Sequence, residues 1–135
     1  MATTVVASVS LYQPLTEPDS IRLIELLPAP QLSCEVECRL IHTSLSQIKH
    51  TFFGHYTAMS YVWGNPEKTK IIYVDGIPLA ITTNLFSALR DSRDKTKPMR
   101  IWVDAVCINQ QDDKEKSFQV PLMGRIYASA LNAII

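Results

Sequence analysis

Cysteine, glycine and net charge are all scarce in this sequence, and each scarcity excludes a class of protein. Three cysteines among 135 residues, with no Cys-x-x-Cys pair, exclude a disulfide framework and a metal site built on paired thiolates. The 13 lysines and arginines balance the 13 aspartates and glutamates, so the positive excess that drives nucleic-acid binding is absent. Four glycines and eight prolines are too few for a low-complexity chain. These features are typical of one globular domain with reduced thiols and no metal.

Long apolar runs are also missing. No stretch approaches the 18 apolar residues that a membrane-spanning helix needs, and no basic residue precedes the weakly apolar N-terminus as it would in a signal peptide. We therefore predict a cytoplasmic protein that binds neither membrane nor nucleic acid.

The residue pattern in the first third of the chain predicts two strands. Residues 1–19 carry Ser, Thr and Pro without a lasting period and predict a loose N-terminal segment. A strand follows from Ile21 until Pro28 stops it, and residues 35–41 alternate charged and apolar side chains with period two. We expect these strands to form an N-terminal antiparallel β-hairpin.

A second hairpin is expected around Asp75 and Gly76. Apolar residues at 71–74 and 77–82 flank this pair, and Asp-Gly readily adopts the positive φ angles of a type I′ turn. Pro78 cannot donate to a sheet ladder, so the second arm is predicted to lie at an edge.

The rest of the chain alternates strands and helices. The expected order is strand 57–63, helix 84–93 capped by Thr82 or Thr83, strand 100–106, helix 113–129 and strand 130–135. Pro121 predicts a kink, or a second helical piece that begins there. Strand, helix and strand in this order predict parallel pairing.

Three ordered blocks resemble the signature of the fungal heterokaryon incompatibility (HET) domain. They are Thr-Ala-Met-Ser-Tyr-Val-Trp-Gly at 57–64, Ile-Trp-Val-Asp-Ala-Val-Cys-Ile-Asn-Gln at 101–110, and a block at 115–127 with Gln119, Val120, Met123, Ile126 and Tyr127. Ile21-Arg22-Leu23 resembles the stretch that commonly precedes the domain. The expected HET domain covers residues 20–135.

The resemblance implies an effector of fungal non-self recognition that leads to programmed cell death and acts through a protein partner or self-association. The HET family is also distantly similar to TIR domains. That similarity implies an α/β fold, TIR-like or flavodoxin-like, whose mainly parallel sheet is flanked by helices. It also leaves an alternative function, in which the domain hydrolyses NAD. NAD is then the one candidate cofactor or substrate. The region expected to supply the catalytic carboxylate would follow residue 135, so the domain is expected to be C-terminally incomplete and this fragment inactive.

Ligands of open α/β sheets gather beyond the carboxyl ends of the strands. The candidate ligand-binding residues there are Tyr61, Trp63, Gly64, Asp104, Asn109 and Gln110. Trp63 would stack on a nucleotide base, and Asp104 would accept hydrogen bonds from ribose hydroxyls.

A structural interpretation competes with each of these roles. Trp63 and Trp102 would fill the core, Gly64 would turn the chain, and the two amide side chains after Cys107 would bind the loop that enters the next helix. Cys107 itself is expected to be a buried structural thiol.

Two carboxylates are candidate catalytic residues, Asp104 and Glu115. Glu115 lies three positions after Asp112, the spacing of a capping box, so a structural role competes with a catalytic one. Lys116 departs from the arginine that usually follows this glutamate in the family.

Overall fold

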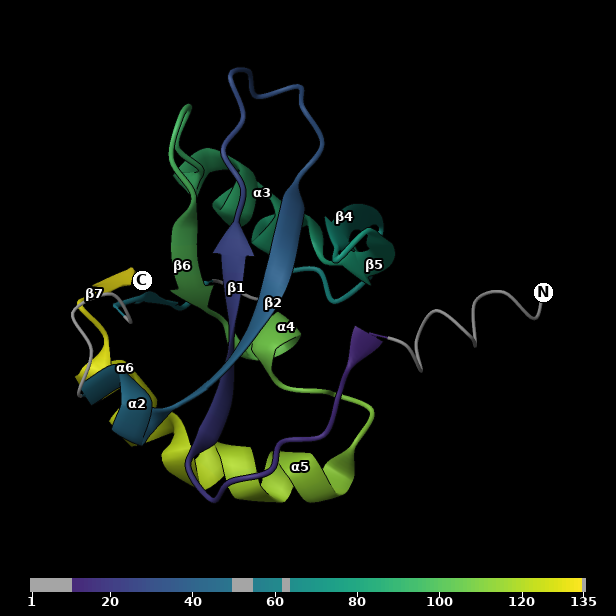
Figure 1. The fold of residues 1–135 in the computed structure, drawn as a ribbon. Helices are drawn as coiled ribbons and strands as arrows, with labels where there is room; N and C mark the ends of the chain where they lie inside the picture. Colours follow the sequence, from purple (N-terminus) through teal and green to yellow (C-terminus); the bar gives the residue numbers. More distant parts are fainter. Residues whose placement is uncertain (1–10, 50–54, 62–63, 135) are drawn as a thin grey trace. The chain divides into compact units, whose positions relative to one another are not determined.

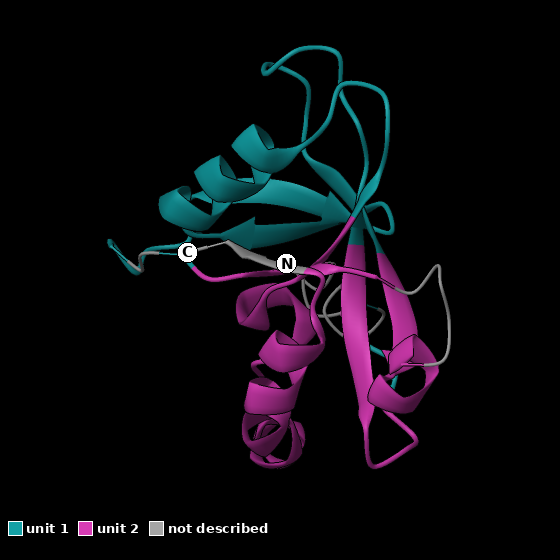
Figure 2. Ribbon diagram, turned by 90° about the vertical axis from the view of Figure 1, so that its left-hand side faces the viewer, with its two compact units in different colours: residues 1–14, 25–39, 61–99 teal, residues 15–24, 40–60, 100–135 magenta. Residues whose placement is uncertain are grey.

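A computed structural model describes residues 11–49, 55–61 and 64–134 as an α/β fold with a mixed β-sheet (Figure 1). Two compact units make up the chain (Figure 2). Unit 1 contains residues 1–14, 25–39 and 61–99, and unit 2 contains residues 15–24, 40–60 and 100–135. Strands β1 (Ser20–Leu26) and β2 (Glu37–Ser44) pass from one unit into the other.

Unit 1 combines a hairpin with one helix. Its strand order is β5-β4-β2, where β4 is Lys70–Val74 and β5 is Ile77–Ile81. β2 and β4 are parallel, with Cys38 opposite Val74. Apart from Thr82, the buried side chains described in this unit are apolar: Leu11, Leu26, Val36, Cys38, Ile72, Val74, Ile81, Leu85 and Leu89.

The Asp75-Gly76 hairpin is confirmed. Both turn residues have positive φ, 53° and 78°, and β4 and β5 are antiparallel with Tyr73 opposite Pro78. β5 ends the strand order of its unit, so Pro78 lies on an edge strand as predicted.

The predicted helix after the hairpin is also confirmed, as α3 (Thr83–Ser92). Thr82 is the N-cap residue, and its hydroxyl accepts a hydrogen bond from the Leu85 N–H at 3.3 Å. This cap satisfies one of the donors that the first helical turn leaves unpaired.

Unit 2 has strand order β1-β6-β3-β7, where β3 is Thr57–Met59, β6 is Met99–Trp102 and β7 is Asn132–Ile134. Ala58 lies opposite Trp102 on one side and Ala133 on the other, and both pairings are parallel. The predicted parallel pairing is therefore confirmed. The buried core of the unit includes Ile21, Leu23, Ile24, Tyr56, Met59, Ile101, Trp102, Val106 and Ile126.

The strand predicted over 100–106 is wrong in its second half. β6 ends at Trp102, and α4 (Asp104–Cys107) follows. The Val103 carbonyl accepts hydrogen bonds from the N–H groups of Val106 and Cys107, at 3.2 and 2.8 Å. The apolar run is buried in both halves, so hydrophobicity alone could not distinguish a strand from a turn of helix.

Pro121 divides the last helical region as predicted. The pieces are α5 (Asp113–Gln119), a 3₁₀ turn η1 (Val120–Leu122) and α6 (Met123–Ser129). Pro121 lies at the start of η1, where its missing N–H costs little. The Tyr56 hydroxyl donates to the Ile126 carbonyl, which anchors α6 beside β3.

Several expectations were incomplete. The short helix α2 (Leu45–Lys49) was not predicted. The predicted strand 35–41 begins two residues and ends three residues too early for β2, and the predicted strand 57–63 extends beyond Met59, where β3 ends. Part of the loose segment 1–19 lies outside the described residues. The antiparallel course of the N-terminal hairpin and the TIR-like sheet stay predictions. Within the described part of the chain, no helix has the length and apolar character needed to cross a membrane.

Candidate functional site

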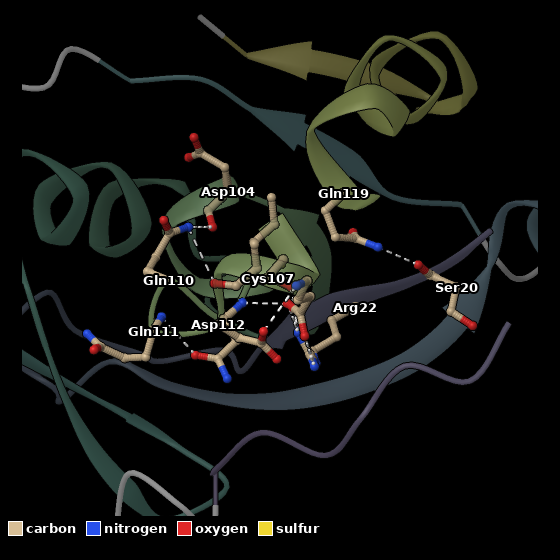
Figure 3. Close-up of polar contacts among 11 residues, drawn as sticks. Ser20, Arg22, Asp104, Cys107, Gln110, Gln111, Asp112 and Gln119 are labelled. Carbon is tan, nitrogen blue, oxygen red and sulfur yellow. Dashed lines mark hydrogen bonds and ion pairs between the residues drawn. The ribbon is translucent and has the colours of Figure 1, made fainter. Parts of the chain in front are cut away.

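A buried ion pair between Arg22 and Glu115 is the centre of the polar network in unit 2 (Figure 3). Arg22 lies in β1, whose neighbouring side chains are buried, and its own side chain is only 1% exposed. Its two terminal nitrogens each lie 2.7 Å from one carboxylate oxygen of Glu115. This bidentate geometry is the strongest pairing that arginine makes with a carboxylate.

Glu115 holds the segment after α4 as well as the arginine. Its Oε2 accepts a hydrogen bond from the Asn109 N–H at 2.7 Å, while Arg22 Nη1 also donates to the Cys107 carbonyl at 3.3 Å. The Glu115 side chain is 9% exposed. Both of its oxygens are therefore bound within the protein.

The predicted capping box is half correct. The Asp112 side chain accepts from the Glu115 N–H at 3.1 Å, as a helix N-cap should. The Asp112 N–H, however, donates to the Asn109 carbonyl at 3.1 Å, and the Glu115 carboxylate binds Arg22. The buried guanidinium outcompetes the return bond because a charge without a partner there would be very costly.

The amide side chains of the second signature block bind backbone. Gln110 Nε2 donates to the carbonyls of Asp104 and Ile108, at 2.9 and 3.4 Å. Asn109 Oδ1 accepts from the Gln111 N–H at 3.1 Å. These bonds fix the chain between α4 and α5.

The carboxylate of Asp104 lies apart from this network, although the backbone carbonyl of Asp104 accepts a hydrogen bond from Gln110. Asp104 begins α4, and Figure 3 shows its side chain pointing away from Arg22. Burial raises the pKa of Asp104, against the effect of hydrogen bonds from the Ala105 N–H and its own N–H. Burial and the charge of Asp104 also raise the pKa of Tyr127, opposed by a hydrogen bond with Ser60.

Trp102 fills the core of unit 2. The indole is 0% exposed and meets the Tyr127 ring edge-on, with ring centroids 5.5 Å apart and an interplanar angle of 78°. Such T-shaped pairs contribute about 0.5–1.5 kcal/mol beyond burial. The structural interpretation of Trp102 is therefore confirmed.

The other predicted ligand residues do not form a described site with Asp104. Trp63 lies outside the described residues, and Tyr61 and Gly64 belong to unit 1 rather than unit 2. Gly64 has φ +57°, and a Cβ there would collide with the side-chain amide of Asn84, so glycine has a structural reason at this turn. The convergence of the two strand ends stays a prediction.

The surroundings of the two buried thiols, Cys38 and Cys107, indicate structural roles. The Cys107 sulfur accepts from the Val103 N–H at 3.4 Å and donates to the Ile101 carbonyl at 3.8 Å. Burial raises the pKa of Cys38 to about 12. Cys34, like these two, is not in a disulfide. Across residues 11–49, 55–61 and 64–134, no group of three or more His, Cys, Asp or Glu side chains could hold a metal ion.

Sequence analysis missed two features of unit 2. Arg22 was noted as part of the stretch that resembles the family and was given no partner, although a lone arginine among buried positions signals a buried acidic partner. The second feature is an open groove of about 460 Å³ between the segment before β1 and the turn from β2 into α2. We call it the β1–α2 groove; it is lined by Leu15, Glu17, Asp19, His42, Ser44 and Ser46, among others.

Comparison with known proteins agrees with the signature blocks. The family model described as heterokaryon incompatibility protein (HET) matches residues 56–135. Heterokaryon incompatibility protein 6, OR allele, of Neurospora crassa is 38% identical over 141 aligned positions, which cover 95% of this chain and 20% of that protein. The chain thus spans about a fifth of the length of this relative. No solved structure matches the chain. The chain belongs to the heterokaryon incompatibility (HET) family.

Proposed function

We propose that this chain acts in fungal non-self recognition, as the HET segment of an incompatibility protein, and that its action leads to cell death. The observation that carries the proposal is the match of the HET family model over residues 56–135, together with a heterokaryon incompatibility protein as a relative. We place this activity in the cytoplasm.

The mechanism that we propose is contact with a protein partner or with a second copy of the chain. The geometry of unit 2 supports contact over catalysis, because Glu115 has both oxygens bound and the amides of Asn109 and Gln110 bind neighbouring backbone groups. In this proposal the signature residues shape a rigid surface that partners recognise.

Hydrolysis of NAD is not part of the proposal. Glu115, one of the two candidate catalytic carboxylates, is held in an ion pair with Arg22. We propose no reaction on the basis of the TIR-like features of the sequence.

The test is inducible expression of the chain in a filamentous fungus. We expect growth arrest and uptake of a vital dye after induction, from the wild-type chain and from the exposed control variant Asp113→Asn. Arg22→Met, which breaks the buried ion pair, should abolish both effects. Normal growth in cells that accumulate the folded wild-type chain would contradict the proposal.

A further inference from the structure

The β1–α2 groove has the dimensions and openness of a binding site for an extended side chain. Its volume of about 460 Å³ falls within the range of roughly 300–1,000 Å³ that is usual for ligand sites. All of its lining residues belong to unit 2, on the segments 15–20 and 42–47. Neither the family match nor the signature blocks include these two segments.

Asp19 provides a fixed negative charge in this groove. Its Oδ2 accepts hydrogen bonds from the N–H and the hydroxyl of Ser46, at 2.9 and 2.5 Å. The Asp19 carbonyl accepts a hydrogen bond from the Leu45 N–H at 3.0 Å, so both the side chain and the backbone of Asp19 are held in place. The Ser46 hydrogen bonds are the main cause of the lowered pKa of Asp19, and the carboxylate stays ionised near neutral pH.

The charge of the groove favours a cationic occupant. Among its described lining residues there are two carboxylates, Glu17 and Asp19, and no lysine or arginine. Arg125 of α6 is close enough to contribute slightly to the lowered pKa of Asp19, so it offsets part of this charge. The two carboxylates suit the charge of an organic cation, and the described residues include no group of three or more His, Cys, Asp or Glu side chains that could hold a metal ion.

The remaining lining suits the stem and head of a long basic side chain. Half-buried Leu15 offers apolar surface to the methylene groups, and residues with hydroxyl groups, such as Ser44, also line the groove. The planar guanidinium of arginine presents five donors, more than the ammonium of lysine. Carboxylates and hydroxyls are the acceptors that it needs.

We infer that the β1–α2 groove binds an arginine side chain of a partner protein, with Asp19 and Glu17 as its carboxylate contacts. This inference rests on the proposed function, because it adds to the partner contact proposed there a second contact, outside the signature blocks.

The test is an NMR titration of the ¹⁵N-labelled full chain with the peptide acetyl-Gly-Arg-Gly-Arg-Gly-amide. We expect amide shifts confined to residues 15–20 and 42–47. A matched peptide with citrulline in place of arginine keeps the shape and loses the charge, and it should cause no shifts there. Equal shifts from both peptides, shifts elsewhere only, or no shifts at all would overturn the assignment.

Variants separate the charge from the fold. Glu17→Gln removes a carboxylate for which no structural bond is described and should raise the Kd about two- to fivefold, the range for an exposed charge pair. Asp19→Asn should raise the Kd by a similar factor, and Arg125→Ala should lower it. Glu67→Gln, an exposed substitution in unit 1, is the matched control and should leave the Kd unchanged. An unchanged Kd in Glu17→Gln and Asp19→Asn would also overturn the inference.

The growth assay keeps the two proposals distinguishable. Growth arrest without peptide binding would refute the groove and leave the proposed function standing. Peptide binding without growth arrest would support the groove and contradict the proposed function.

Discussion

The ion pair between Arg22 and Glu115 gives the most quantitative prediction. The substitution Arg22→Met keeps an unbranched apolar stem and removes the charge, which leaves the Glu115 carboxylate nearly buried with the Asn109 N–H as a remaining donor. Removal of one partner from a buried pair typically costs about 3–5 kcal/mol. With an unfolding entropy of about 2.1 cal/mol/K per residue, 135 residues give about 0.28 kcal/mol/K, so Tm should fall by roughly 10–18 °C.

The same reasoning predicts a rescue. Glu115→Gln alone strands the arginine charge and should cost a similar amount, although glutamine retains an acceptor for the Asn109 N–H. The double variant Arg22→Met/Glu115→Gln removes both charges, and replacing a buried pair by neutral groups is often close to neutral. We therefore expect the double variant to be more stable than either single variant.

Urea denaturation followed by circular dichroism measures these differences. The pair Arg39 and Glu25 is a matched control, because its closest atoms are 3.8 Å apart and Arg39 is 66% exposed. Arg39→Met should cost less than about 1 kcal/mol. A cost below about 1 kcal/mol for Arg22→Met, or additive losses in the double variant, would refute the assignment of a tightly coupled buried pair.

Three further predictions concern a cap, a turn and a thiol. Asp112→Ala removes the side-chain acceptor of the Glu115 N–H and should cost about 1 kcal/mol in urea denaturation; an unchanged midpoint would contradict the cap. Gly64→Ala must adopt φ +57° and meets Asn84, so it should cost at least about 1–2 kcal/mol in the same assay, and a neutral effect would show a different turn. The pKa of Cys38 is raised from 9.0 to about 12, so between these pH values the folded state keeps a proton that the unfolded state loses. Stability should fall there by roughly 1.4 kcal/mol per pH unit, more steeply than in Cys38→Ala, and identical slopes would contradict the burial of the thiol.

Local signals made a turn, a helix start and a helix break predictable. Asp75-Gly76, the Thr82 cap and Pro121 each act within a few residues, and the structure places a turn, a helix start and a helix break at these positions. The strand predicted over 100–106 failed because its apolar residues are buried in the strand and in α4 alike.

The partners of the candidate site were beyond sequence analysis for a physical reason. Arg22 and Glu115 are separated by 93 positions, and no local pattern couples residues at that distance. The spacing of Asp112 and Glu115 is a local signal. It predicted the N-cap at Asp112 but not the ion pair that the Glu115 carboxylate forms with Arg22. The β1–α2 groove depends on α2, whose five residues are too few to show a helical period.

We infer that the signature residue Glu115 acts by holding the fold rather than by catalysis. The most direct measurement is growth arrest after induced expression of the double variant Arg22→Met/Glu115→Gln beside the single variant Glu115→Gln. We predict that the double variant, once its cooperative unfolding shows that it folds, arrests growth as the wild type does, while the single variant does not. A folded double variant that leaves growth normal would contradict this claim.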